Sequence, residues 1–117
     1  QGGKNILASE YIEMFDTRKR IWAAVQTAVQ GYDALILPTS PTLPPALSSL
    51  RDIQAKTTQN AKCLRNTAIS NYLDRPTITI PCHATDTGPV GVSLIGSRQH
   101  DRRLLAIAAA SEAVIRG

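Results

Sequence analysis

Apolar side chains recur at helical spacing near the start of the chain. They follow one another at steps of three, four or seven residues: Ile12, Phe15, Trp22, Val25 and Val29. This spacing places them on one face and predicts a single amphipathic helix over residues 9–30. Ser9 is a favourable N-cap for such a helix, and Gly31 suits the left-handed position that ends many helices.

A short apolar run over residues 33–37 follows, and Pro38 closes it. Its length predicts a buried strand. Residues 38–45 hold four of the seven prolines, which predicts a stiff, extended loop. We favour a loop over a proline-rich peptide ligand. Loops that leave the carboxyl end of a buried strand are where α/β proteins place ligand contacts.

The second half of the chain alternates between the spacing typical of helices and the alternation typical of strands. Helical spacing over residues 59–73 and 101–116 predicts two helices, and β-branched alternation over residues 76–80 predicts a strand. A second strand is predicted over residues 90–95. Residues 48–58 are left undecided between a loop and a helical turn or two.

The two later strands are separated by a short turn-rich linker, which predicts that they pair antiparallel. Gly91 within the second of them indicates close backbone packing. Asp101 is a natural N-cap for the final helix, and Gly117 ends it. The resulting order of helix, strand, helix, strand, strand and helix predicts an α/β or α+β layer with few strands.

Composition and charge narrow the possible classes of protein. The longest apolar run, residues 104–110, is far shorter than the stretch of about 20 residues that a membrane helix needs. The net charge is +4, and the basic side chains gather at residues 17–20 and 98–103. No aromatic side chains interleave with them, so we favour solvated helix faces over nucleic-acid binding. Charged residues are only 19% of the chain, which indicates surface covered by something else.

The chain carries little recognisable catalytic chemistry of its own. Nucleophile-elbow and phosphate-loop motifs are missing, and Ser48 and Ser49 have no glycine neighbours. His83 and His100 have no evident acidic partner, so we nominate no catalytic residue. Two cysteines make neither a disulfide framework nor a metal site, so no metal is expected. A reducing, cytoplasmic compartment is the default expectation.

Several segments together carry a family resemblance. They occur in one order along the chain: YDALILPTSP at residues 32–41, RNT and NYL at residues 65–67 and 71–73, TITIPC at residues 77–82, and GPVGVSLIG at residues 88–96. This ordered set, with the closing helix, resembles the amidase signature hydrolases. The resemblance covers about residues 11–116.

The resemblance implies the fold and the class of reaction. Members of this family hydrolyse amides, or transfer ammonia from them, with a serine nucleophile, a second serine on a cis peptide and a lysine base. The Gly/Ser-rich signature that carries these groups is missing here. Residues 1–117 are therefore expected to be a C-terminal segment of the αβα amidase domain, a partial mixed sheet flanked by helices. The segment is expected to be inactive alone and to need no cofactor, and residues 1–2 could be a tag remnant.

The resemblance also implies candidate substrate-binding residues. In such enzymes the loop after the "PT-x-P" strand helps to line the acyl pocket. Thr39, Ser40 and Pro41 are the corresponding candidates in this chain. Arg65 and Asn66 come second, as polar groups near the same rim. The expected partner is a small amide substrate in the full-length enzyme.

Two departures and one rival interpretation accompany the resemblance. Asp74 and Arg75 replace a common Gly-x pair, and His83 stands where glycine usually permits a positive φ. The rival interpretation is a non-catalytic assembly or RNA-associated module, such as part of an amidotransferase subunit. Strands cut from a larger sheet would expose edges and an apolar face, so we also expect homo-oligomers.

Overall fold

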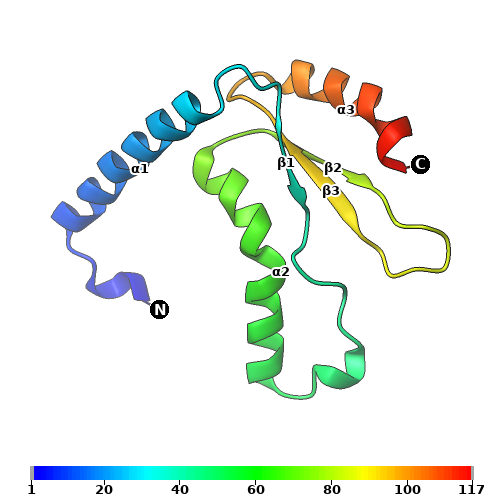
Figure 1. The fold of residues 1–117 in the computed structure, drawn as a ribbon. Helices are drawn as coiled ribbons and strands as arrows, with labels where there is room; N and C mark the ends of the chain where they lie inside the picture. The colour runs from blue at the N-terminus through cyan, green and yellow to red at the C-terminus, as the bar shows by residue number, and fades with distance from the viewer. Residues whose placement is uncertain (1, 117) are drawn as a thin grey trace. The chain divides into compact units, whose positions relative to one another are not determined.

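The computed structural model describes residues 2–116 and divides into two compact units, one ending at Tyr32 and the other beginning at Asp33. The first unit holds a 3₁₀ helix η1 (Gly2–Asn5) and α1 (Ala8–Ala28). The second unit contains β1 (Leu35–Pro38), η2 (Leu47–Ser49), α2 (Ile53–Leu73), β2 (Thr77–Pro81), β3 (Gly91–Ile95) and α3 (Asp101–Arg116), as Figure 1 shows. The tag-remnant expectation at Gln1 and the helix end at Gly117 lie outside the described residues.

The first unit confirms the long N-terminal helix and corrects its cap. The N-cap is Leu7, in an extended conformation, and its backbone N–H donates to the Glu10 carboxylate at 2.7 Å. Ser9 instead lies inside the first turn, so its prediction as N-cap was wrong. The reason is that a carboxylate three residues beyond the cap can satisfy the free N–H without a capping hydroxyl. Gly31 has a φ of +89°, as its predicted left-handed position requires.

The three strands form a small sheet in the order β1-β3-β2. Both neighbouring pairs are antiparallel, which confirms the predicted β2–β3 pairing. The α/β fold class is confirmed, although the described strands are antiparallel throughout rather than mixed. Leu37 of β1 and Thr79 of β2 both lie opposite Ser93 of the central strand. This register places three neighbouring strand positions on one face of the sheet.

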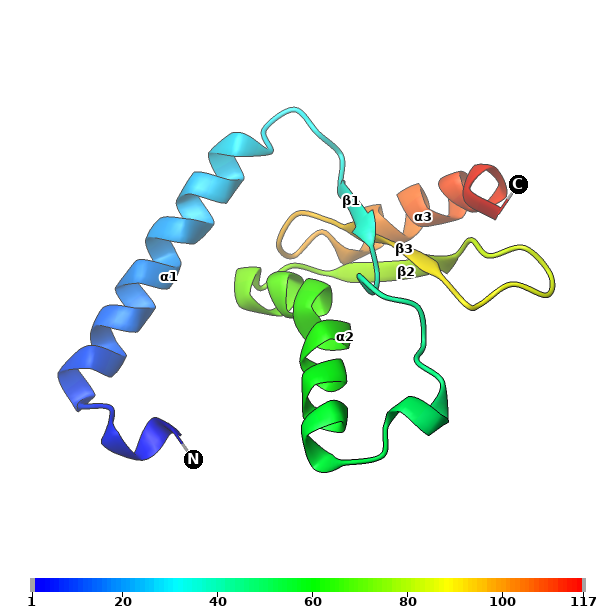
Figure 2. The ribbon, with the colours of Figure 1, turned by 60° about the horizontal axis from the view of Figure 1, so that its bottom comes forward.

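One face of the sheet is covered by α3, which runs along β2 and β3 in Figures 1 and 2. The core here consists of Ile80, Leu94, Leu104 and Ala108, each at most 5% exposed. The helix approaches closely, because a Cβ at Gly96 would stand 3.2 Å from that of Leu104. The helix begins at Asp101 as expected, but Asp101 lies inside its first turn, so its prediction as the N-cap was wrong.

Figure 2 shows α2 on a different side of the sheet from α3. The helix begins at Ile53, because the Asp52 side chain accepts the Ala55 N–H at 2.7 Å. Helical structure therefore includes most of the segment that the hydrophobic pattern left undecided. The buried residues of α2 are Asn66, Ser70 and Leu73, all in its C-terminal half, so this half of the helix faces the sheet.

The two departures from the family pattern behave differently. Asp74 ends α2 with a φ of +53°, so it adopts the left-handed conformation that glycine adopts readily. His83 has no positive φ; Asp86 supplies it in the β2–β3 turn. The replacement of glycine by His83 therefore imposes no backbone strain there. None of the helices described is long and apolar enough to cross a membrane.

Candidate functional site

The loop that leaves β1 continues the sheet for one residue and then turns. The Thr39 N–H donates to the Gly91 carbonyl at 2.8 Å. Ser40 then holds a local turn, because its hydroxyl donates to the Thr42 carbonyl at 2.9 Å. Residues 39–42, here called the β1 loop, are all half-buried. The loop is therefore ordered by its own hydrogen bonds and keeps part of its surface accessible.

Three hydroxyl groups, one from the β1 loop and two from strands, meet beneath this loop. Thr39 Oγ1 lies 2.7 Å from Ser93 Oγ and 3.2 Å from Thr79 Oγ1, and the last two oxygens are 3.1 Å apart. We call this group the hydroxyl triangle. Each hydroxyl has a single hydrogen, so bonds around a closed triangle use all three hydrogens. The lone pairs that remain can accept a hydrogen bond from a ligand donor.

One face of α2 holds the β1 loop by side-chain hydrogen bonds. Asn66 Nδ2 donates to the carbonyl of Pro38 at 2.7 Å, and Gln59 Nε2 donates to Thr42 Oγ1 at 3.2 Å. Gln59 Nε2 also lies 3.6 Å from the Cys63 sulfur. These three α2 residues follow helical spacing and lie one above another on that face. The helix therefore fixes both ends of the β1 loop.

The sequence candidates fall into a single neighbourhood. Thr39, Ser40 and Pro41 form the start of the β1 loop, and Asn66 anchors the residue before it. Arg65 lies beside Asn66, with its Nε 3.4 Å from Asn66 Oδ1. The structure thus brings all five candidates to one end of β1.

Four further residues of this neighbourhood were not nominated from the sequence. They are Thr42, Gln59, Thr79 and Ser93. Thr79 and Ser93 occupy alternating positions of predicted strands, but only the strand register shows that they meet Thr39. Gln59 shares a helix face with Asn66, and this seven-residue spacing was the one signal available in the sequence.

The other polar residues considered from the sequence form no catalytic group. His83 and His100 are both exposed, and each ring contacts a backbone carbonyl, of Val90 at 3.3 Å and of Arg98 at 2.8 Å. Ser49 donates to the Ala46 carbonyl at 2.7 Å. Within residues 2–116, no cluster of three or more histidine, cysteine or acidic side chains could hold a metal ion.

An open concavity lies at the C-terminal end of α2. Its volume is about 470 Å³, and its lining residues are Ser70, Asn71, Asp74, Arg75, Pro76, Gln99 and Asp101. Two of its margins are held internally, since Arg98 pairs with Asp74 at 2.6 Å and Arg75 donates to the Gly96 carbonyl at 3.1 Å. It shares no residue with the candidate site.

Replacing Asn66 with alanine is expected to destabilise this unit by about 1 kcal/mol, because the Pro38 carbonyl would lose its side-chain partner. Urea unfolding of the two proteins measures this difference. Asn60 is the matched control: it is exposed on the same helix, and Asn60→Ala is expected to change the free energy of unfolding by less than about 0.5 kcal/mol. Equal effects of the two changes would contradict the anchoring role.

The chain is similar to known proteins over nearly its whole length. A family model described as Amidase matches residues 1–105. The 2-amino-5-chloromuconic acid deaminase of Comamonas testosteroni is 31% identical over 113 residues, which cover 96% of this chain and 24% of that protein. A glutamyl-tRNA(Gln) amidotransferase subunit of Dehalococcoides mccartyi is 32% identical over 98 residues, covering 84% of this chain and 20% of that protein.

Solved structures agree with this similarity. An S177A allophanate hydrolase of Kluyveromyces lactis superposes with a TM-score of 0.76 at 27% identity, over 92% of this chain and 17% of that one. A structure described as an amidase gives a TM-score of 0.70 at 21% identity, over 97% of this chain and 26% of that one, which shows the fold. The chain spans about a quarter or less of the curated relatives above. On the family match over most of its length, the chain belongs to the amidase family.

Proposed function

We propose that this chain is the C-terminal portion of a longer amide hydrolase, and that the groups that cleave the amide bond lie upstream of it. The observation that carries the proposal is the amidase match over residues 1–105, in a chain that spans only 24% of its deaminase relative. In this proposal the chain completes the substrate pocket of the longer enzyme.

The contacts of the lysine side chains support the placing of the catalytic groups outside this chain. A serine nucleophile needs a base within hydrogen-bond reach to remove its proton. In the described part of the chain Lys19 pairs with Asp16 at 3.1 Å, and no lysine ammonium contacts a serine hydroxyl. The proposed nucleophile and base are therefore sought in the remainder of the longer protein.

Within this proposal the β1 loop binds and orients the acyl part of the amide. Thr39, Ser40 and Pro41 are half-buried and are held in place from below by the hydroxyl triangle and from the side by Asn66. Holding a substrate in one geometry lowers the entropic part of the activation barrier. The free lone pairs of the triangle can accept a hydrogen bond from an amide N–H.

A second candidate function is ammonia transfer. It is favoured by the resemblance to the glutamyl-tRNA(Gln) amidotransferase subunit of Dehalococcoides mccartyi, at 32% identity. The same site would then pass the ammonia to a partner instead of releasing it into the solvent. Contact with RNA is no part of the first proposal, because Arg98 and Arg103 of the basic C-terminal stretch pair with Asp74 and Asp33 within this chain.

Compartment and self-association complete the proposal. Both Cys63 and Cys82 are free thiols, which suits a reducing compartment such as the cytoplasm. The formation of homo-oligomers stays a prediction. Exposed apolar side chains such as Ile36, at 67%, and Ile53, at 82%, are available for it.

Ammonia release from simple primary amides tests the proposed reaction. The full-length protein is expected to release ammonia, and this chain alone is expected to release none. Thr39→Val in the full-length protein is expected to raise KM about three- to tenfold, since one hydrogen bond to the substrate would be lost. Thr58→Val is the control, because Thr58 is exposed on α2 and lies outside the β1 loop and the hydroxyl triangle.

Two results would contradict the proposal. Turnover by the isolated chain would show that the reacting groups lie within it. Failure of the full-length protein to release ammonia from any amide would remove the hydrolase function. A requirement for an added partner before ammonia is released would favour the transfer function instead.

Thr39→Ser keeps the hydroxyl and is expected to retain the original KM within about twofold.

A further inference from the structure

The helix α2 carries positive charge without a compensating acid. Lys56, Lys62 and Arg65 are its charged residues, and the sequence has no aspartate or glutamate between Asp52 and Asp74. Asp52 is occupied as the N-cap of the helix, where it accepts the Ala55 N–H. The surface of α2 near the β1 loop therefore has a positive potential that no neighbouring carboxylate on the helix reduces.

The guanidinium of Arg65 is held beside the β1 loop by two successive contacts. Its Nε lies 3.4 Å from Asn66 Oδ1, and Asn66 Nδ2 donates in turn to the Pro38 carbonyl at 2.7 Å. Only the Nε position of Arg65 is used in this way. Within residues 2–116, neither terminal nitrogen of this guanidinium has a hydrogen-bond or carboxylate partner. Two parallel donors therefore remain for a ligand.

Other arginines of the same unit show what such a group binds when an acid is near. Arg98 pairs with Asp74 at 2.6 Å, Arg116 pairs with Glu112 at 2.7 Å, and Arg103 pairs with Asp33. The carboxylate that satisfies Arg98, Arg103 or Arg116 in each case belongs to this chain. Arg65 differs from these three arginines, because its Nε contacts an amide oxygen and not a carboxylate.

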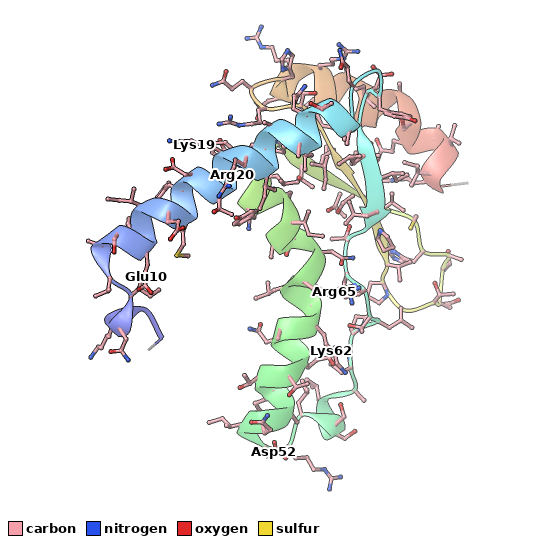
Figure 3. All side chains as sticks on the ribbon, turned by 60° about the vertical axis from the view of Figure 1, so that its left-hand side comes forward. Glu10, Lys19, Arg20, Asp52, Lys62 and Arg65 are labelled. Carbon is pink, nitrogen blue, oxygen red and sulfur yellow. The ribbon has the colours of Figure 1, made fainter. Side chains whose placement is uncertain are left out.

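A second cation lies on the same side of the helix. Lys62 precedes Arg65 by three residues, a spacing that places the two side chains on one face. Figure 3 shows Lys62 and Arg65 extending from α2 on the side toward the loop that follows β1. An anion bound between the loop and the helix would meet both charges.

We propose that Arg65, assisted by Lys62, binds a carboxylate group of the substrate, so that the amide recognised here carries a carboxylate. The inference rests on the proposed amide hydrolase function and names its substrate class. A carboxylate matches the planar fork of the guanidinium with two parallel hydrogen bonds. RNA is disfavoured, because the aromatic side chain of α2 is Tyr72 alone and stacking platforms normally accompany a basic RNA surface.

A pair of amides of equal length tests this specificity in the full-length protein. Succinamic acid carries a carboxylate, whereas butanamide has a methyl group in its place. Arg65→Gln is expected to raise KM for succinamic acid about tenfold and to change KM for butanamide less than twofold. Arg65→Lys is expected to recover part of the loss, because it restores charge without the fork. Lys56→Gln removes a cation from the same helix and is expected to change neither value.

Several results would overturn the proposal. The first is an equal rise in KM for both amides in Arg65→Gln, and the second is a lack of preference of the unsubstituted protein for succinamic acid. The third concerns RNA: if the protein binds polyuridylate, Arg65→Gln would abolish that binding and leave KM for succinamic acid unchanged. Calorimetric titration with succinate separates this proposal from the proposed function. Succinate binding that Arg65→Gln abolishes, in a protein that cleaves no amide, would support the anion site and refute the hydrolase. If Arg65→Gln cleaves both substrates as the unsubstituted protein does, the hydrolase function would be supported and the anion site refuted.

Discussion

Leu104→Ala is expected to destabilise the second unit by about 2–5 kcal/mol. Leu104 is 3% exposed and packs with Ile80, Leu94 and Ala108 between α3 and the sheet. The backbone of Gly96 also approaches this side chain closely, so truncation leaves a cavity between two rigid elements. The free energy of unfolding in urea measures the loss, and the slope of the transition reports whether the core still unfolds as one unit.

The neighbouring Leu105 provides a matched control for this change. It has the same side chain in the same helix, but it is 58% exposed. Leu105→Ala is expected to change the free energy of unfolding by less than about 0.5 kcal/mol, because little apolar surface is uncovered. A Leu105→Ala loss equal to that of Leu104→Ala would mean that α3 packs on the sheet through a different face.

Gly91→Ala is expected to cost about 1–3 kcal/mol. A Cβ at this position of the central strand would stand 2.7 Å from Thr79 Cγ2 and 3.3 Å from Thr39 Oγ1. Thr79 cannot rotate away freely, since its hydroxyl takes part in the hydroxyl triangle at 3.1 Å from Ser93 Oγ. The added methyl group must therefore push the strand or break the triangle. Urea unfolding measures the cost.

A double-mutant cycle identifies the atom responsible. Thr79→Ser removes Cγ2 and keeps the hydroxyl, so Gly91→Ala is expected to cost at least about 1 kcal/mol less in the Thr79→Ser background than alone. Ile78→Val serves as a control, because this side chain of β2 points to the other face of the sheet. Purely additive effects of Gly91→Ala and Thr79→Ser would place the clash elsewhere.

Elements with a strong local pattern were predictable from the sequence. The strands expected over residues 76–80 and 90–95 are β2 and β3 within one residue, because alternation and flanking proline or glycine define their limits. The start of α2 was missed by about two turns. Its first turns are mostly polar and exposed, and the Asp52 side chain caps the helix there. A cap of this kind does not change the spacing of hydrophobic residues, so the sequence pattern did not reveal it.

The candidate site was predictable only in part. The β1 loop follows from its prolines and from its position after an apolar strand, and the family resemblance adds Arg65 and Asn66. The hydroxyl triangle does not follow, because it requires Thr39 and Thr79 to reach Ser93 from two different sides of the central strand. A shift of one residue in either strand would turn these side chains to the opposite face. Strand register across the sheet is therefore the information that the sequence pattern lacks.

The strand order β1-β3-β2 also bears on how the second unit assembles. Pairing of β2 with β3 closes a short loop, residues 82–90. The core residues on the α3 face come from β2, β3 and α3, which are consecutive in the chain. Adding β1 to β3 must instead enclose residues 39–90, so it loses more chain entropy before any contact forms. The two strands and α3 can thus form a local folding nucleus, and the strand that presents the β1 loop joins it last. We therefore expect the candidate site to be assembled at the end of folding, on a scaffold that forms before it.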